Sequence, residues 1–253
     1  EVVATQGYDS VTIDLQHGLV DYSSVVQMLQ AIELAGVAPM IRVPWLEPGI
    51  IMKSLDAGSL GIICPMINNR DEALALVSYC KYPPLGKRSF GPTRANFCMG
   101  PDYYSTANSE VICLAMIETM RAMENIEEIV TTPGLDGVYI GPSDLAIGIT
   151  DGRLAPGFDR KEEEMIDAIE KIRLASFKAG IRSAIHCGSP EYAADAVYNG
   201  FDLVTVSNDV RLLASAAKDS VDSFRSSYSS LCSGKILFRP GHVNEKKSEG
   251  GGY

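Results

Sequence analysis

Short apolar runs recur along the chain, and they limit what it can fold into more than any other feature. Each run is almost continuous in apolar residues, as is typical of strands that are buried on both faces of a parallel sheet. Helical patterns separate most of the runs; Asp21 begins one such pattern and Gly36 ends it. Repeated strand–helix units predict a parallel sheet. We expect seven strands, at residues 10–14, 39–43, 61–65, 111–118, 137–140, 182–186 and 202–206.

Seven strands that each lead to a helix are one short of a (β/α)8 barrel. The opening letters EVVATQG have the pattern of a helix end, so we expect the first barrel strand to lie upstream of Glu1. The alternative is an open doubly wound sheet, which usually has a G-x-G-x-x-G turn after its first strand. The corresponding turn here reads DLQHG (14–18), so an α/β fold of the (β/α)8 TIM barrel type is predicted. We expect the barrel domain to span residues 1–230 and a flexible tail to follow at 231–253.

Composition narrows the range of partners. The formal net charge of −10 argues against nucleic acid or an anionic membrane surface, because both require a basic face. The longest apolar runs, such as LGIICPMI at 60–67, fall well short of the roughly 20 residues of a membrane span. Six cysteines are scattered without a C-x-x-C pair, which indicates a reduced, cytoplasmic protein.

Polar residues are concentrated where the predicted strands end. The carboxyl ends of the strands form the active face of a barrel, so this placement indicates a catalytic site rather than a solvated surface. The residues concerned are Asp14, His17, Arg42, Glu118, Asp144 and His186.

Glu118 and Asp144 follow consecutive predicted strands. Taken alone, each could be a salt-bridge partner or a helix cap. Because neighbouring strands lie about 4.8 Å apart, the two carboxylates can reach one ion. Two carboxylates, with the remaining positions open to water and substrate, suit Mg²⁺ or Mn²⁺ better than a closed zinc site. The small, rigid turn at Gly141 and Pro142 would let ligand and backbone approach closely.

Three further groups have both a structural and a functional interpretation. Arg42 could pair with one of the acids, or it could bind a carboxylate or a developing oxyanion. Asp14 and His17 form D-x-x-H, in which the carboxylate could orient the imidazole and raise its basicity for general-base work. His186 could have a structural role or contact substrate.

With these residues in place, the chain resembles the metal-dependent (class II) pyruvate aldolases of the HpcH/HpaI type. This family includes 4-hydroxy-2-oxoheptanedioate aldolase, 2-dehydro-3-deoxyglucarate aldolase and, more distantly, macrophomate synthase. The resemblance runs from about residue 7 to about residue 227. Six motifs in order make it specific: GYDSVTIDLQHG (7–18), IRVPW (41–45), DAGSLGIICPMINNRDEA (56–73), YPPLGKRSFGPTRA (82–95), MIET (116–119) and GVYIGPSDLA (137–146).

The resemblance implies a barrel of the phosphoenolpyruvate/pyruvate type and a lyase activity. Such an enzyme cleaves 4-hydroxy-2-keto acids to pyruvate and an aldehyde through a metal-bound pyruvate enolate, in the catabolism of aromatic compounds or sugar acids. The resemblance places Mg²⁺, Mn²⁺ or Co²⁺ on Glu118 and Asp144. Arg42 would bind pyruvate and its enolate, and His17, oriented by Asp14, would be the acid/base.

Further positions follow from the same resemblance. The backbone of Pro142 and Ser143 would meet the pyruvate carboxylate, and Arg88 would lie near the aldehyde half. Met116 would lie beside the substrate, where the family commonly has Gln, so one hydrogen bond near the metal is lost. Gln16 stands where the family has Glu, and Ser89 where it has Gly. The segment at 94–104 is a few residues shorter than the family pattern.

Two other functions stay open at this point. One is a related lyase or decarboxylase that acts on oxaloacetate or an acyl-CoA thioester by the same metal-enolate chemistry. The other is a barrel without catalytic activity that binds a keto acid. 

The last helical pattern bears on assembly. It begins near Asn208 and Asp209 and carries an apolar stripe, which could simply close the barrel. The resemblance implies instead that this helix is exchanged between subunits and that pairs build a homo-hexamer. The stripe consists of Val210, Leu213, Ala217, Val221 and Phe224.

Overall fold

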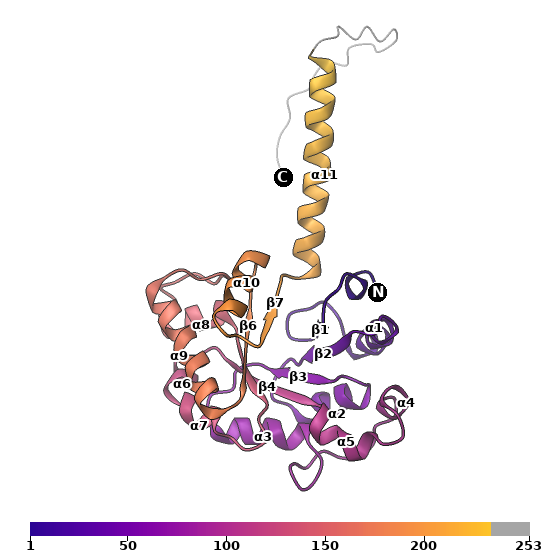
Figure 1. Cartoon of the computed structure of the whole chain (residues 1–253), viewed down its shortest axis with the longest axis vertical. Coiled ribbons are helices and arrows are strands. Elements are labelled where there is room, and N and C mark those ends of the chain that lie inside the picture. The colour runs from indigo at the N-terminus through magenta and orange to yellow at the C-terminus, as the bar shows by residue number, and fades with distance from the viewer. Residues whose placement is uncertain (234–253) are drawn as a thin grey trace, which may run out of the picture. The chain divides into compact units, whose positions relative to one another are not determined.

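The computed structural model describes residues 1–233, and its centre is a parallel sheet whose strands follow one another in chain order (Figure 1). The seven predicted strands are confirmed, and each strand end lies within one residue of its predicted position. The strands are β1 (Ser10–Asp14), β2 (Ala38–Arg42), β3 (Gly61–Cys64), β4 (Ile112–Ile117), β5 (Gly137–Ile140), β6 (Arg182–His186) and β7 (Leu203–Thr205).

The sheet curls from β1 to β7 as one continuous parallel set. This sequential order excludes the open doubly wound sheet, in which the strand order reverses at a switch point. Among residues 1–233, no eighth strand joins β7 to β1. The structure is therefore a curled, seven-stranded half-barrel, and it confirms the predicted (β/α)8 barrel to that extent.

Helices connect the strands and cover the outer face of the sheet (Figure 1). Their ends follow local rules. The Asp21 carboxylate caps α1 by accepting from the Ser24 N–H at 3.0 Å, and Pro190 is the first residue of α10. The connecting helices are α1 (Tyr22–Leu34), α2 (Pro48–Asp56), α3 (Arg70–Cys80), α4 (Ala95–Met99), α5 (Tyr103–Glu110), α6 (Met120–Glu124), α7 (Ile126–Val130), α8 (Pro142–Ile149), α9 (Glu163–Ala179) and α10 (Pro190–Tyr198). The short helix η1 (Val3–Thr5) precedes β1, and α11 (Asp209–Cys232) follows β7 in the chain.

Strand residues alternate between two apolar cores. Side chains such as Ile41 and Ile117 pack against the helices. With a period of two, the opposite, inner face receives Arg42, Glu118 and His186 at the carboxyl ends of their strands. Below these polar groups the inner face carries a smaller apolar cluster, formed by Met40, Ile63, Leu114, Met116, Tyr139 and Ala184.

Residues from Asp209 onward form a second compact unit, distinct from the Glu1–Asn208 unit that contains the sheet. Its described part is α11, which confirms the helix predicted to begin near Asn208 and Asp209. Residues 234–253, most of the predicted tail, lie outside the described residues. The predicted apolar stripe is exposed on α11: Val210, Leu213, Ala217, Val221 and Phe224.

Two expectations from composition concern the cysteines and the lack of a membrane-spanning segment. All six cysteines are free thiols. Within residues 1–233, no helix is long and apolar enough to cross a membrane.

Candidate functional site

At the carboxyl ends of β1 and β2, a carboxylate and a guanidinium form an ion pair. Asp14 and Arg42 are register partners in the two strands. Arg42 Nε donates to Asp14 Oδ1 at 2.8 Å, and Nη2 donates to Oδ2 at 2.5 Å. Burial alone would raise the pKa of Asp14, but the hydrogen bond and charge of Arg42 outweigh it and lower that pKa below its usual value. The pair therefore holds Arg42 in one orientation as a permanent cation.

Asp14 also shapes the turn that follows it. Its Oδ1 accepts from the backbone N–H of Gln16 at 2.9 Å and of His17 at 3.3 Å. Gly18 folds back so closely that an added Cβ would lie 2.1 Å from the Asp14 carbonyl oxygen. The contact between Asp14 and His17 is thus made through the backbone, and the His17 side chain is exposed beside the strand ends.

Glu118 directly follows β4 and is buried, with 2% of its surface exposed. Its Oε1 accepts from the Met66 N–H at 2.8 Å. Gly141 makes room on the other side, because a Cβ there would lie 2.5 Å from Glu118 Oε2. Thr119 is the residue that caps α6, through its hydroxyl and the Ala122 N–H at 3.0 Å. A capping role for Glu118 is therefore excluded.

Burial and a neighbouring negative charge oppose the ionisation of Glu118. Burial is the largest cause and Asp144 adds to it, whereas the Met66 N–H and Arg42 act in the opposite direction. Together these groups raise the pKa of Glu118 to about 7. A cation would stabilise the charged form of such a pair, so the two carboxylates fit a divalent metal ion.

Asp144 lies in the first turn of α8 and is exposed. The N-cap of that helix is Gly141, so the capping role considered for Asp144 is wrong. Within residues 1–233, no group of three or more His, Cys, Asp or Glu side chains could hold a metal ion. A cation here would have carboxylate ligands from Glu118 and Asp144, and its other positions would be left to water and substrate, as Mg²⁺ commonly requires.

Met66 is a site residue that sequence reasoning missed. Its φ of 58° is unusual for a residue with a side chain, and this bend directs the Met66 N–H at Glu118. The next residue, Ile67, donates its N–H to the Met116 carbonyl at 3.2 Å, which anchors the bend. No polar side chain marks Met66 in the sequence, because the group that acts is a backbone N–H.

The turn after β5 places Pro142 and Ser143 next to Gly141, in the first turn of α8. Pro142 is buried and Ser143 is half-buried. Met116 lies on the inner face of β4, and its Cε would lie 3.0 Å from a Cβ at Gly141. The Met116 thioether therefore borders the same space as the Glu118 carboxylate.

The structure does not bring Arg88 to the carboxyl ends of the strands. Its guanidinium donates to Asp56 Oδ1 at 2.7 Å and to the Tyr103 hydroxyl at 2.8 Å. Asp56 is the last residue of α2, which runs antiparallel to the parallel strands it connects, so Arg88 lies at their amino ends. The expected position near the aldehyde half therefore disagrees with the fold of this chain.

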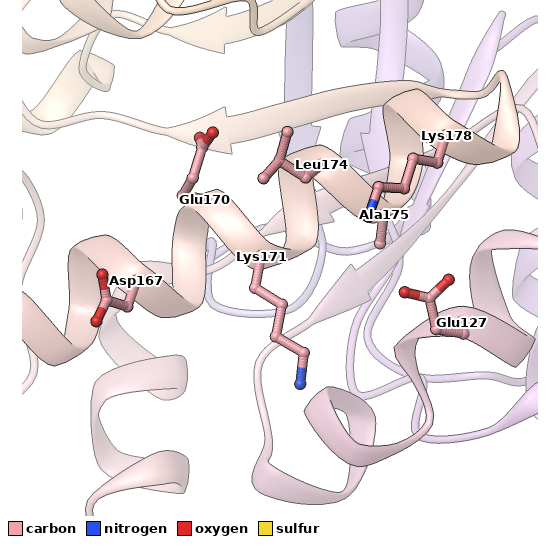
Figure 2. Close-up of a pocket in the computed structure, with 7 residues that line it drawn as sticks. All are labelled: Glu127, Asp167, Glu170, Lys171, Leu174, Ala175 and Lys178. Carbon is pink, nitrogen blue, oxygen red and sulfur yellow. The ribbon is translucent and has the colours of Figure 1, made fainter.

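A surface groove lies apart from the strand ends. Figure 2 shows it on the outer helical layer, where Glu127 of α7 and a row of side chains along α9 line it. Lys171 Nζ donates to the Met123 carbonyl at 3.3 Å beside it. No residue of the groove belongs to the polar strand ends; the lining residues are Glu127, Asp167, Glu170, Lys171, Leu174, Ala175 and Lys178.

A family model, known protein sequences and a solved structure all match this chain over most of its length. The family model described as HpcH/HpaI aldolase/citrate lyase matches residues 1–216. The chain is 45% identical over 218 residues to a hydroxypyruvate/pyruvate aldolase of Rhizorhabdus wittichii, with 86% of each chain covered. It is 32% identical over 228 residues to a 5-keto-4-deoxy-D-glucarate aldolase of an Enterobacter species, covering 89% of this chain and 87% of that one. A crystal structure of an HpcH/HpaI aldolase/citrate lyase family protein from Burkholderia cenocepacia matches with a TM-score of 0.80 and 31% identity, over 88% of each chain.

Proposed function

Because this chain belongs to the HpcH/HpaI aldolase/citrate lyase family, we propose that it is a class II aldolase that cleaves 4-hydroxy-2-keto acids to pyruvate and an aldehyde. One observation carries the proposal. A buried carboxylate, Glu118, is placed beside a second carboxylate, Asp144, on the same strand ends that hold the paired cation Arg42. The aldolase names of the relatives support the same reaction class.

Glu118 and Asp144 would hold the divalent cation, with Mg²⁺ or Mn²⁺ as the first choice and Co²⁺ as a further possibility. When bound, the ion supplies Lewis acidity at the keto oxygen of the substrate. The Gly141 turn supports this role, since a side chain at that position would clash with Glu118 Oε2. 

Arg42 and His17 divide the remaining chemistry. As the C3–C4 bond breaks, negative charge develops on the keto oxygen, and the Arg42 guanidinium is preorganised to stabilise it. The charges of Arg42 and Glu118 interact across the site, which supports their placement around one substrate. The exposed His17 would accept the C4 hydroxyl proton, directly or through a water molecule.

The lysines argue against a Schiff-base aldolase. Lys81 is buried, pairs with Asp136 at 3.0 Å and donates to the Val111 carbonyl just before β4, at the amino ends of the strands. Lys53 of α2 lies over the ring of Tyr22, the first residue of α1. Lys87 lies in the same amino-end segment, directly before Arg88. A metal-assisted enolate is therefore the mechanism that the site residues favour.

The direct test is pyruvate release from a panel of 4-hydroxy-2-keto acids, before and after EDTA treatment. We expect EDTA to abolish the activity and Mg²⁺, Mn²⁺ or Co²⁺ to restore it. Decarboxylation of oxaloacetate without any aldol cleavage would favour the related decarboxylase instead, because that reaction needs no base at His17. A pyruvate adduct trapped on a lysine by borohydride would refute the metal-dependent mechanism.

Assembly is the second part of the proposal. The apolar stripe of α11 is exposed, and Phe224, with 69% of its surface accessible, lies in its later half. A partner subunit that covers this stripe would bury it, and loss of a large buried aromatic side chain costs about 3–5 kcal/mol. We expect a homo-hexamer with exchanged C-terminal helices, which Phe224→Asp dissociates. Light scattering that gives a wild-type monomer at micromolar concentration would refute it.

A further inference from the structure

One asparagine side chain joins the exits of two neighbouring strands, β3 and β4, beside the Glu118 carboxylate. Asn68 lies in the loop between β3 and α3, and Thr119 directly follows Glu118 at the end of β4. Asn68 Nδ2 donates to the Met66 carbonyl at 2.6 Å, and Asn68 Oδ1 accepts from the Thr119 hydroxyl at 2.5 Å. The amide thus uses its donor on one strand exit and its acceptor on the other.

The backbone of Asn68 is held as firmly as its side chain. Its N–H donates to Glu72 Oε2 at 2.6 Å, and its carbonyl accepts from Asn125 Nδ2 at 2.8 Å. Glu72 belongs to α3, and Asn125 lies between α6 and α7. The anchors therefore come from the helical segments that follow the same two strands, and every polar group of Asn68 has a partner.

The bond to the Met66 carbonyl closes a bend that is unfavourable for Met66 itself. Met66 has a φ of 58°, in the left-handed region that a side chain disfavours. Ile67 is buried and donates its N–H to the Met116 carbonyl at 3.2 Å, which anchors the far side of the bend together with Asn68. The φ of Met66 then sets the direction of its own N–H, which meets Glu118 Oε1 at 2.8 Å.

This contact gives the two oxygens of the Glu118 carboxylate different surroundings. Oε1 accepts from Met66 at the β3 exit, whereas Oε2 faces the β5 exit, where a Cβ on Gly141 would lie 2.5 Å away. Asp144 belongs to the helix that starts at this second exit. The Met66 N–H therefore occupies one oxygen of Glu118 and leaves the other turned toward the side from which the second carboxylate comes.

We propose that Asn68 is a positioning residue for Glu118, because it holds the Met66 bend and the β4 exit in place and so orients the carboxylate before a divalent cation binds. The inference rests on the proposed metal-dependent function, and Asn68 acts in it through the Met66 N–H. Groups that orient a metal ligand commonly change the affinity of a site about 10- to 100-fold. Loss of the bridge should therefore weaken cation binding although both carboxylates remain.

The test measures Mn²⁺ binding to the metal-free protein by electron paramagnetic resonance, without substrate. We expect Asn68→Ala to raise the Kd for Mn²⁺ about tenfold, because Glu118 is no longer held in one orientation. The matched control is the next residue. Asn69 caps α3 by accepting from the Glu72 N–H at 2.9 Å, so Asn69→Ala should lower the Tm and leave the Kd unchanged.

A second pair of variants tests the other end of the bridge and decides the question if Asn68→Ala does not fold. Thr119→Val removes the hydroxyl that donates to Asn68, so it should weaken Mn²⁺ binding, whereas Thr119→Ser keeps this hydroxyl and should bind as the wild type does. Saturating Mn²⁺ should restore most of the pyruvate release of Asn68→Ala but not that of Glu118→Gln, because only the second variant lacks a proposed ligand.

A wild-type Kd in Asn68→Ala, or equal increases in Asn68→Ala and Asn69→Ala, overturns the role of Asn68 while the aldolase proposal stands. Equal Kd values in Thr119→Val and Thr119→Ser overturn it as well. A wild-type protein that binds no Mn²⁺ and releases pyruvate in the presence of EDTA overturns both proposals.

Discussion

Two arginine–aspartate pairs lie at opposite ends of the same sheet, Arg42–Asp14 at the carboxyl ends of the strands and Arg88–Asp56 at the amino ends. Their ion pairs are similar in length, at 2.5 Å and 2.7 Å. The difference lies in what surrounds them. The Arg42 side chain is 20% exposed, whereas that of Arg88 is 0% exposed.

Aromatic rings account for this difference. The Arg88 guanidinium lies 4.5 Å from the Tyr82 ring centroid and 5.5 Å from the Tyr103 ring centroid, so aromatic side chains help to enclose it. Arg42 has Asp14 along one edge and the buried Glu118 nearby. The same ion pair can therefore serve as a closed structural element or as an anion-binding group, and the decisive feature is whether the cation keeps an open side.

The largest effect is expected for Glu118→Gln at the carboxyl end. Removal of this carboxylate eliminates a proposed metal ligand, so kcat/KM for pyruvate release should fall about 10³-fold or more. The fold should survive, because a neutral amide relieves the repulsion between Glu118 and Asp144. Kinetics and thermal unfolding of the same preparations check both points. An active Glu118→Gln enzyme would exclude the proposed ligand.

Arg42→Ala and His17→Ala separate the two reactions. In the proposed mechanism Arg42 would stabilise the enolate charge that both reactions develop, so its loss should cost about 10²- to 10³-fold in aldol cleavage and in oxaloacetate decarboxylation. His17→Ala should cost about 10²-fold in aldol cleavage but far less in decarboxylation, which needs no proton removal from C4. Steady-state kinetics with both substrates provide the measurement. Equal losses in the two reactions would contradict this division of roles.

Arg88→Met tests the closed pair. It leaves Asp56, whose side chain is 23% exposed, without its cation and empties a buried site, which should destabilise the protein by up to about 3–5 kcal/mol. Because Arg88 lies at the amino ends, kcat of the folded fraction should stay within about twofold of the wild-type value. Urea unfolding followed by kinetics below the transition checks the prediction. A large loss of kcat with normal stability would place Arg88 in the active site after all, for example through a neighbouring subunit.

The smallest effect concerns the pH dependence of the metal-free protein. The pKa of Glu118 is about 7 in the folded state against an ordinary value of 4.5. The folded protein therefore binds more protons than the unfolded chain in this window. The contribution of Glu118 to the stability of the folded state is present below pH 4.5 and is lost as the pH rises through 7. We expect the Tm of EDTA-treated protein to fall relative to Glu118→Gln between these values. Added metal should raise Tm more at pH 8 than at pH 6, because the ligand must be deprotonated. Parallel curves for the two proteins would show that Glu118 is ionised normally.

The sequence by itself determined the strands and the polar groups at their ends. Continuous apolar runs can be satisfied only by strands buried on both faces, and a period of two then directs Arg42 and Glu118 to the inner side. Carboxylates that follow consecutive parallel strands must meet at one edge of the sheet, so the proximity of Glu118 and Asp144 could be predicted from the sequence. The apolar stripe of α11 could likewise be predicted from its helical spacing, whereas its exposure is seen only in the structure.

Tertiary structure alone decided which partners these groups take. Asp14 pairs with Arg42 rather than with the nearby His17 ring, because strand register places Arg42 opposite it. Arg88 belongs to a recognisable motif, yet the direction of α2 and α3 carries it to the amino ends. The Met66 N–H and the contact between Phe158 and His186 depend on backbone bends and loop docking. Such contacts join residues far apart in the chain, and a linear pattern has no periodicity that encodes them.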